Sequence, residues 1–308
     1  MSVKLYTAAV ALLALAACTN DENYDPFADG LVAAQVTAGI SRAMTRISTD
    51  DGGAASFTAD DVIHVVADGD TYDYSYDGTG WSAVITPYYF QDHNDVTFRA
   101  WYTADPNVEV KDNKISIDTH TQTYSETGWN YHDILVTPGV KTTVSNPSVS
   151  FTGDNAFRHI MSQVVFTFKA GEGVPDLSKL YGYTLDNIVI GATFDTQSLE
   201  LTAETAESDK GFIDIMGIDD ASGDEYTAFP LILVPQTITS GKINLLVTYN
   251  EQTYKATLNV PEDGNLQPGY SYAYTVTVSN TELKVSNVTI EDWQTLKDFN
   301  GEGDATLQ

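Results

Sequence analysis

Apolar and polar residues alternate along many short stretches of this chain, with the period of two that is typical of half-buried β-strands. The first such stretch after residue 30 is also the clearest, and similar stretches follow to residue 293. The predicted strands cover residues 32–40, 62–66, 72–76, 96–102, 115–117, 133–136, 164–168, 188–190, 231–234, 243–249, 254–260, 270–278, 283–285 and 288–293. Turn-forming Gly, Pro, Asn and Asp lie between most of them. No stretch beyond residue 18 shows a sustained helical period with caps, so the pattern predicts an all-β chain.

The strands fall into two groups. Residues 138–153 mix Pro, Gly, Asn, Ser and Thr, and this composition suggests a boundary near residue 150. At 308 residues the chain is long enough for two domains of ordinary size. Short, closely spaced strands with turn chemistry between them indicate β-sandwiches. We therefore expect an N-terminal β-sandwich domain over residues 47–152 and a C-terminal one over residues 153–308.

The first 18 residues form an apolar leader that ends in a cysteine. Lys4 precedes a short apolar run, which closes on Leu15-Ala16-Ala17-Cys18. A bacterial lipoprotein signal has this form, and the run is too short to span a bilayer. The pattern predicts a signal peptide over residues 1–18 and lipidation of Cys18, where two or more acyl chains would hold the mature N-terminus in a membrane. The alternative is an ordinary signal peptide whose cysteine is incidental.

Residues 19–46 join a polar tether to the first alternating strand. The strand is followed by Arg42 and Arg46, and then by a polar, glycine-containing loop at residues 48–53. Because the chain has only 15 Lys and Arg against 43 Asp and Glu, two arginines four residues apart stand out. An arginine between a strand and a mobile loop is where a trypsin-like protease would cut. We expect cleavage after Arg46, with Arg42 as second choice; the alternative is a pair of ordinary surface arginines.

The charge balance limits the classes of partner. The formal net charge is -28 and the isoelectric point is near 4.1. Such a surface repels nucleic acid and anionic membranes. Cys18 is the only cysteine, so the fold has neither a disulfide nor a cluster of thiol ligands.

The sequence contains few motifs that are typical of catalytic or metal-binding sites. It contains no Gly-x-Ser-x-Gly, no His-Glu-x-x-His and no phosphate-binding glycine loop. The histidines are scattered, and we interpret His159 as a structural residue at the start of a strand. Asp68 and Asp70 lack the spacing of a calcium loop and indicate an acidic turn. The tryptophans could stack on sugars if they were exposed, but in a β-rich chain we expect most of them in the core; they are Trp81, Trp101, Trp129 and Trp293. We therefore expect no enzymatic activity, no cofactor and no metal.

Short motifs spread through the chain resemble one family. They are Leu15-Ala16-Ala17-Cys18; Thr45-Arg46; Asp61-Val62-Ile63 with the tyrosine-rich stretch ending at Trp81; His159 with Val164-Val165-Phe166; Val234-Pro235-Gln236; Leu266-Gln267-Pro268-Gly269-Tyr270-Ser271-Tyr272-Ala273-Tyr274; and Val288-Thr289-Ile290-Glu291-Asp292-Trp293. Each motif is weak alone, but their order and spacing span nearly the whole chain. In this respect the sequence resembles the Bacteroidetes fimbrillins, the Mfa-like or type V pilin group.

The resemblance implies two tandem transthyretin-like β-sandwich domains, export as a lipoprotein and, in pilins, cleavage after an arginine. Removal of the strand before the arginine would open a groove in the first domain. A strand from the next subunit's C-terminal region would fill this groove and build a fibre by main-chain pairing. The residue pattern supports this independently, because the apolar residues of the first strand would leave pockets that must be covered again. These residues are Val32, Ala34, Val36, Ala38 and Ile40.

Two features depart from the family pattern. Ile47 follows Arg46, and a β-branched residue after the cut slows some proteases. Residues 301–308 alternate only weakly, so the segment that would act as donor strand stays open.

We therefore expect a structural or adhesive fimbrial subunit at the outer membrane and extracellular surface. Its expected partners are other pilin subunits, the membrane through the lipid on Cys18, and a host protein or glycan, but no nucleic acid. The alternative is a surface lipoprotein that does not polymerise, either a pilus anchor or a glycan- or protein-binding module. The sequence does not distinguish a stalk, tip or base subunit.

Overall fold

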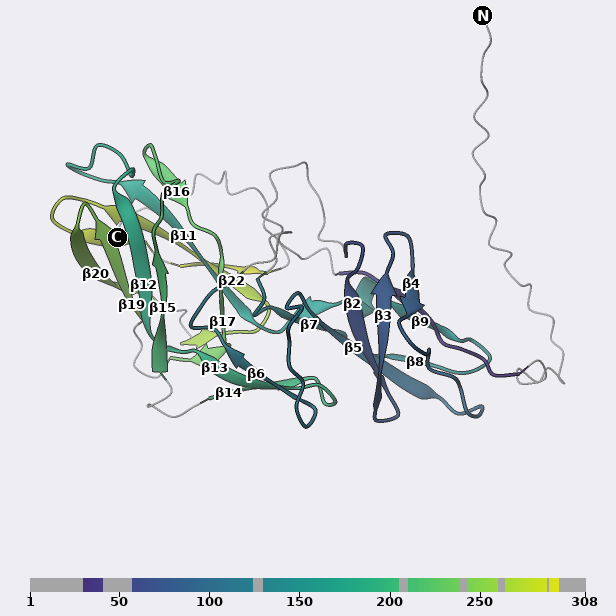
Figure 1. Ribbon diagram of the computed structural model, residues 1–308. Coiled ribbons are helices and arrows are strands. Elements are labelled where there is room, and N and C mark those ends of the chain that lie inside the picture. The colour runs from purple at the N-terminus through teal and green to yellow at the C-terminus, as the bar shows by residue number, and fades with distance from the viewer. Residues whose placement is uncertain are drawn as a thin grey trace, which may run out of the picture.

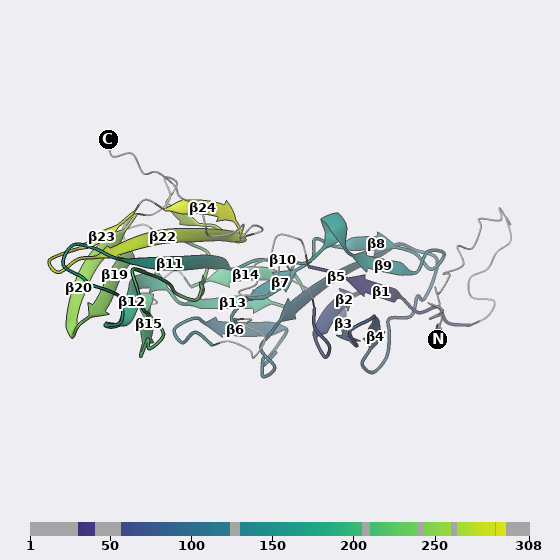
Figure 2. The ribbon, with the colours of Figure 1, turned by 90° about the horizontal axis from the view of Figure 1, so that it is seen from above.

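The computed structural model describes residues 30–40, 57–123, 130–204, 210–238, 243–259, 264–286 and 288–293. Within these residues the chain is all-β, which confirms the predicted fold class, and its one helical element is the short 3-10 turn η1 (Gly153–Asn155). No helix in this described part is long and apolar enough to cross a membrane. The strands form two bodies that lie end to end in an elongated molecule (Figures 1 and 2).

The N-terminal body is built on a seven-stranded sheet. Its strands run in the order β10-β7-β5-β2-β3-β4, and β8 also pairs with β5. A separate parallel pair, β1 and β9, covers one face of this sheet. The bounds are β1 (Gln35–Ala38), β2 (Val62–Ala67), β3 (Asp70–Tyr76), β4 (Trp81–Ala83), β5 (Val96–Thr103), β7 (Ile134–Val136), β8 (Val140–Thr142), β9 (Ser148–Phe151) and β10 (Arg158–His159).

The C-terminal body is a β-sandwich of a six-stranded and a four-stranded sheet. The six-stranded sheet contains β11 (Ser162–Ala170), β16 (Glu225–Thr227), β17 (Leu231–Leu233), β22 (Tyr270–Val278), β23 (Leu283–Val285) and β24 (Thr289–Asp292). The four-stranded sheet contains β12 (Leu180–Val189), β15 (Lys210–Met216), β19 (Ile243–Tyr249) and β20 (Gln252–Leu258). A small pair closes one end, β18 (Gln236–Thr237) and β21 (Asn265–Leu266).

A third small sheet lies between the two bodies. It runs in the order β14-β13-β6, where β6 (Lys114–Asp118) comes from the first half of the sequence. The other two strands, β13 (Gly191–Asp195) and β14 (Glu200–Ala203), come from the second half. Strand pairing therefore links distant parts of the chain.

Three apolar cores follow from side-chain alternation. In β11, Phe166 and Phe168 point into the C-terminal sandwich, where they contact Tyr183 of β12. In β5, Phe98 faces the N-terminal core beneath β1 and β9, whereas Trp101 faces the opposite side. The third core lies on that opposite side and joins β5 and β7 to β6, β13 and the C-terminal Trp293. The central strands β2, β5 and β7 are thus largely buried on both faces, in keeping with their nearly continuous apolar runs, whereas β3 and β4 keep one exposed face.

Turn chemistry explains the first hairpin. Asp68 and Gly69 connect β2 to β3 with φ angles of 51° and 86°. A two-residue turn with both φ angles positive matches the twist of paired strands, and an Asp-Gly pair adopts it at low cost. The expected strand, turn and tyrosine-rich strand are confirmed here, and Tyr74 of β3 is buried while Asp73 is exposed.

The expected division at residues 152 and 153 falls between β9 and η1. Phe157, which follows it, packs in the N-terminal core, and β10 pairs with β7 of the N-terminal sheet. The pairing of β6 with β13 crosses the same point of the sequence. The assignment of residues 47–152 and 153–308 to separate domains therefore stays a prediction.

Candidate functional site

The predicted removable strand is part of the N-terminal core. Of its apolar residues, Ala34, Val36 and Ile40 are 5%, 6% and 8% exposed, and Val32 and Ala38 are half-buried. The alternate residues Gln35 and Thr37 are exposed. The regular strand β1 is shorter than the alternating stretch, but isolated bridges at Ala33 and Ile40 extend it.

Both edges of β1 are occupied. On one side it pairs in parallel with β9, with Val36 opposite Val149 and Ala38 opposite Phe151. On the other side the segment 88–90 bonds to its beginning: Ala34 N donates to Tyr88 O at 2.9 Å, and Phe90 N donates to Val32 O at 3.0 Å. The strand therefore lies in a slot between β9 and this segment. The aromatic run at 88–90 was not predicted as a flank of the strand, although its apolar content was visible in the sequence.

An aromatic cluster closes the C-terminal end of the slot. Phe57 makes edge contacts with Trp81 (4.9 Å between ring centroids) and Tyr102 (5.2 Å). Phe157 also packs edge-on against the ring of Phe57, and its main chain forms a parallel bridge with Ile40. Trp81 Nε1 donates to the Ala38 carbonyl at 3.4 Å. These contacts fix the position at which β1 leaves the core.

Two tyrosines beside the slot carry buried hydroxyl groups. Tyr102 donates to Asp61 at 2.8 Å, and Tyr88 donates to Asp68 at 2.6 Å. Burial, with the neighbouring carboxylate, raises the pKa of both hydroxyls, so both tyrosines stay neutral donors at physiological pH. The side chains that β1 inserts into the core are apolar.

Three predicted sites lie outside the described residues: Cys18, Arg42 and Arg46. Lipidation at Cys18 and cleavage at the two arginines stay predictions. The regular strand β1 ends at Ala38, and Ile40 forms an isolated bridge two residues later.

The buried histidine is held by two partners. His159 Nδ1 lies 2.7 Å from Asp133 Oδ2, and the imidazole stacks on Trp293 with ring centroids 3.6 Å apart and planes 3° apart. This arrangement ties β10, the loop before β7 and the end of β24 together. Trp101 and Trp293 are each 2% exposed, as expected of core tryptophans; Trp81 is half-buried, and Trp129 lies outside the described residues.

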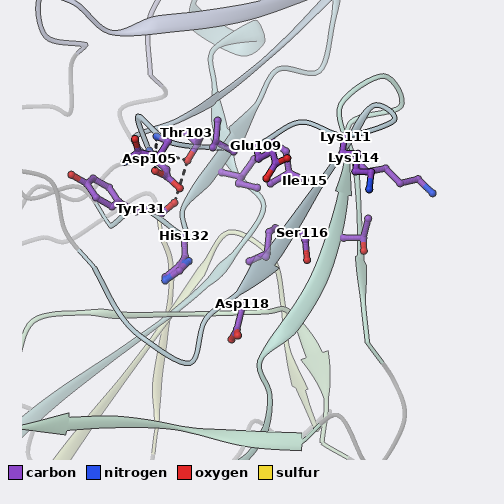
Figure 3. Close-up of a pocket in the computed structure, with 15 residues that line it drawn as sticks. Thr103, Asp105, Glu109, Lys111, Lys114, Ile115, Ser116, Asp118, Tyr131 and His132 are labelled. Atoms are coloured by element: carbon purple, nitrogen blue, oxygen red, sulfur yellow. Dashed lines mark hydrogen bonds between the residues drawn. The ribbon is translucent and has the colours of Figure 1, made fainter.

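A groove of about 720 Å³ lies beside β6 in the third sheet. One wall is β6 itself, and the other is formed by the end of β5 and by Tyr131 and His132 (Figure 3). The loop that carries Asp105 and Glu109 crosses one end. Sequence reasoning missed this groove because its walls come from three separate stretches.

The described residues contain no group of three or more His, Cys, Asp or Glu side chains placed to hold a metal ion. His64 contacts Asp73 and Trp101, and His132 Nε2 lies 2.6 Å from the Thr121 carbonyl. What the geometry does support is the binding of a β-strand in the slot by main-chain pairing.

A family model described as fimbrillin-like matches residues 43–293. The chain belongs to the fimbrillin-like family. It is therefore a fimbrial or adhesin-type subunit of a surface appendage, a structural protein rather than an enzyme.

Solved structures agree on the fold of this fimbrillin-like chain. Two are described as a "putative cell adhesion protein". The one from Bacteroides uniformis is 20% identical with a TM-score of 0.65, over 87% of this chain and 99% of its own. The one from Bacteroides ovatus is 19% identical with a TM-score of 0.66, over 86% and 99%. A fimbrial protein from Bacteroides vulgatus is 13% identical with a TM-score of 0.50, over 86% and 99%. At these identities the likeness concerns the fold alone, and no curated protein sequence matches.

Proposed function

We propose that this fimbrillin-like chain is a pilus subunit that polymerises by strand exchange. It is exported as a lipoprotein acylated on Cys18 and cut after Arg46 or Arg42. The segment that contains β1 is then lost, and a strand from the C-terminal region of another subunit takes its place. Main-chain hydrogen bonds give such a joint its strength, and alternate side chains in pockets set its register.

The observation that carries this proposal is the position of β1. It is the first described strand, it pairs with β9 along one side, the residues just before it bond to segment 88–90 on the other, and it inserts alternate side chains into the N-terminal core. Arg42 and Arg46 come two and six positions after Ile40, which is buried and is the last residue described before them. The family match begins at residue 43 and therefore does not include β1.

Loss of β1 would leave a vacancy that favours replacement. Burying one Val or Ile side chain stabilises a fold by about 1.5–3 kcal/mol, so uncovering Val36 and Ile40 with their neighbours costs several times the thermal energy. The edges of β9 and of segment 88–90 would lose their main-chain partners at the same time. A strand of similar pattern from a second subunit restores both sets of contacts.

The test compares the purified precursor before and after treatment with an arginine-specific protease. We expect cleaved protein to form ladders of stable oligomers on unheated denaturing gels, and mass spectrometry to find mature chains that start at Ile47 or Ala43. The matched control replaces both arginines, Arg42→Lys and Arg46→Lys, which keeps the charge and blocks cleavage. Cleaved protein that stays monomeric would contradict strand exchange.

A second mass spectrum, of the surface-exposed protein from cells that express it, decides the alternative role. A mature chain that begins at lipidated Cys18 and retains β1 would identify an anchored subunit or a monomeric surface binder. A chain that begins after an arginine would have lost the lipid together with the strand.

A further inference from the structure

One edge of β6 bonds to Lys111 at its first residue, Lys114, and pairs with no other described segment beyond that residue. Thr119 N donates to Ile190 O and Thr196 N donates to Asn113 O, so the odd-numbered residues 113–119 bond β13. Because the bonding direction alternates along an antiparallel strand, the main-chain groups of Ser116 and Asp118 point away from β13. No described strand pairs with this edge.

The open edge faces the groove beside β6. At about 720 Å³ the groove has the size of sites that hold small ligands or short peptide segments. Ile115 and Ile117 belong to the third core, so the floor of the groove is rigid and apolar. Figure 3 shows Ser116 and Asp118 along one wall, with Thr103, Tyr131 and His132 across from them. An extended main chain placed here would lie next to the free N–H and C=O groups of β6.

Acidic side chains outnumber the lysines that line the groove. Asp105, Glu109 and Asp118 line it, and none of them forms an ion pair with a described residue. Lys111 and Lys114 lie at the turn end of β6, where they extend away from the other labelled side chains (Figure 3). Added to a net charge of -28, the three carboxylates favour a cationic occupant.

We propose that this groove binds an extended, positively charged peptide segment of another protein, which adds as a strand to the free edge of β6. This edge favours a peptide over a sugar as ligand, because it offers the alternating N–H donors and C=O acceptors that pair with an extended main chain. The acidic walls select a basic segment and disfavour a second copy of this acidic chain. The site is separate from the slot of β1, so it does not depend on polymerisation.

The test measures binding of two capped, fluorescent hexapeptides to the uncut precursor by fluorescence polarisation. One is Lys-Val-Thr-Val-Lys-Val, and the other is its charge-reversed partner with Glu in place of Lys. We expect the basic peptide to bind and its affinity to fall with salt, while the acidic peptide does not bind at about 1 mM.

Two substitutions at Ser116 separate main-chain pairing from side-chain contact. Ser116→Pro removes the N–H that points into the groove, and proline is tolerated at this position because the N–H makes no ladder bond. Ser116→Ala keeps the N–H and serves as the matched control. We expect Ser116→Pro to weaken binding about tenfold and Ser116→Ala to leave it within about twofold. Asp118→Asn should weaken binding of the basic peptide and flatten its salt dependence.

Several results would overturn the proposal. Binding of the basic peptide that Ser116→Pro leaves unchanged would show that β6 does not pair with it, and equal binding of the acidic peptide would show that charge does not select the ligand. Absence of binding, or displacement of the peptide by glycans instead of by excess unlabelled peptide, would overturn it as well. Melting curves of each variant confirm that it is folded. Failure of protease-induced polymerisation bears only on the proposed pilus function, because the uncut monomer is used here.

Discussion

Two histidine–tryptophan stacks, each with an aspartate, flank the third core. His159 and Trp293 form the buried one with Asp133. His64 and Trp101 form the other, with ring centroids 3.9 Å apart, and Asp73 Oδ1 lies 2.7 Å from His64 Nδ1. The two sites differ in exposure: the side chains of His64 and Asp73 are 23% and 46% exposed, against 3% and 4% in the buried pair. The contribution of the more exposed pair to stability is therefore small.

The hydrogen bond with His64 lowers the pKa of Asp73. An aspartate whose folded pKa lies below its unfolded value of about 3.9 stabilises the fold above that value, and this stability is lost as the pH falls through the folded pKa. We expect Asp73→Asn to lower the free energy of unfolding by less than about 1 kcal/mol near pH 7, since solvent screens the pair, and by a smaller amount near pH 3, below the unfolded pKa. Urea denaturation at both pH values measures this. A deficit of equal size at both would contradict it, and Asp70→Asn is the exposed control.

At the scale of the element, β1 shows how the alternation of side chains along a strand decides which residues enter the core. Val36 and Thr37 are adjacent, yet one is 6% exposed in the core and the other faces solvent. Val36→Asp would bury an unpaired carboxylate, and we expect it to cost on the order of 3 kcal/mol of stability. Thr37→Asp introduces the same charge on the outer face and should change stability by less than about 0.5 kcal/mol. Thermal melts of the two uncut precursor variants measure this difference. Equal stability of the two variants would refute the buried position of Val36.

Some elements could be predicted from the sequence and others could not, for physical reasons. The faces of β1, the β2–β3 hairpin and the apolar face of β11 follow from alternation and turn chemistry. β15 was missed because its exposed face carries Phe212 and Met216, so that apolar residues occur on both sides. The register of β12 shifts near Asn187, whose φ of 67° interrupts the period. The slot and the groove depend on pairings between distant segments, which local patterns do not encode.

At the scale of the whole molecule, the two bodies are joined by side-chain bonds in addition to the third core. Arg99 of β5 donates to the carbonyls of Gln197 and Ser198 at 2.9 and 3.0 Å, in the turn between β13 and β14. In addition, Gln197 Nε2 donates a hydrogen bond to Thr71 Oγ1 of β3 at 3.2 Å. The β13–β14 turn is therefore held against the N-terminal sheet.

Removing this contact should loosen the junction. We expect Arg99→Ala to leave two partly exposed backbone carbonyls to water and to cost about 0.5–1.5 kcal/mol locally. Hydrogen exchange followed by mass spectrometry should show faster exchange in residues 195–200, with the C-terminal sandwich unchanged. Lys141→Ala, which removes only an exposed pair with Asp95, is the control. Unchanged exchange in the turn would refute the role of Arg99.

The parallel pairing of β1 with β9 has a mechanical consequence. A strand that lies beside its partner and is pulled along its own axis is loaded in shear, so its hydrogen bonds with β9 and with segment 88–90 resist together instead of opening one at a time. Any strand that occupies this slot and is pulled from one end inherits that geometry. A fibre joined in this way would yield under tension by the rupture of a whole joint, and its tensile strength would be set by the length of the slot.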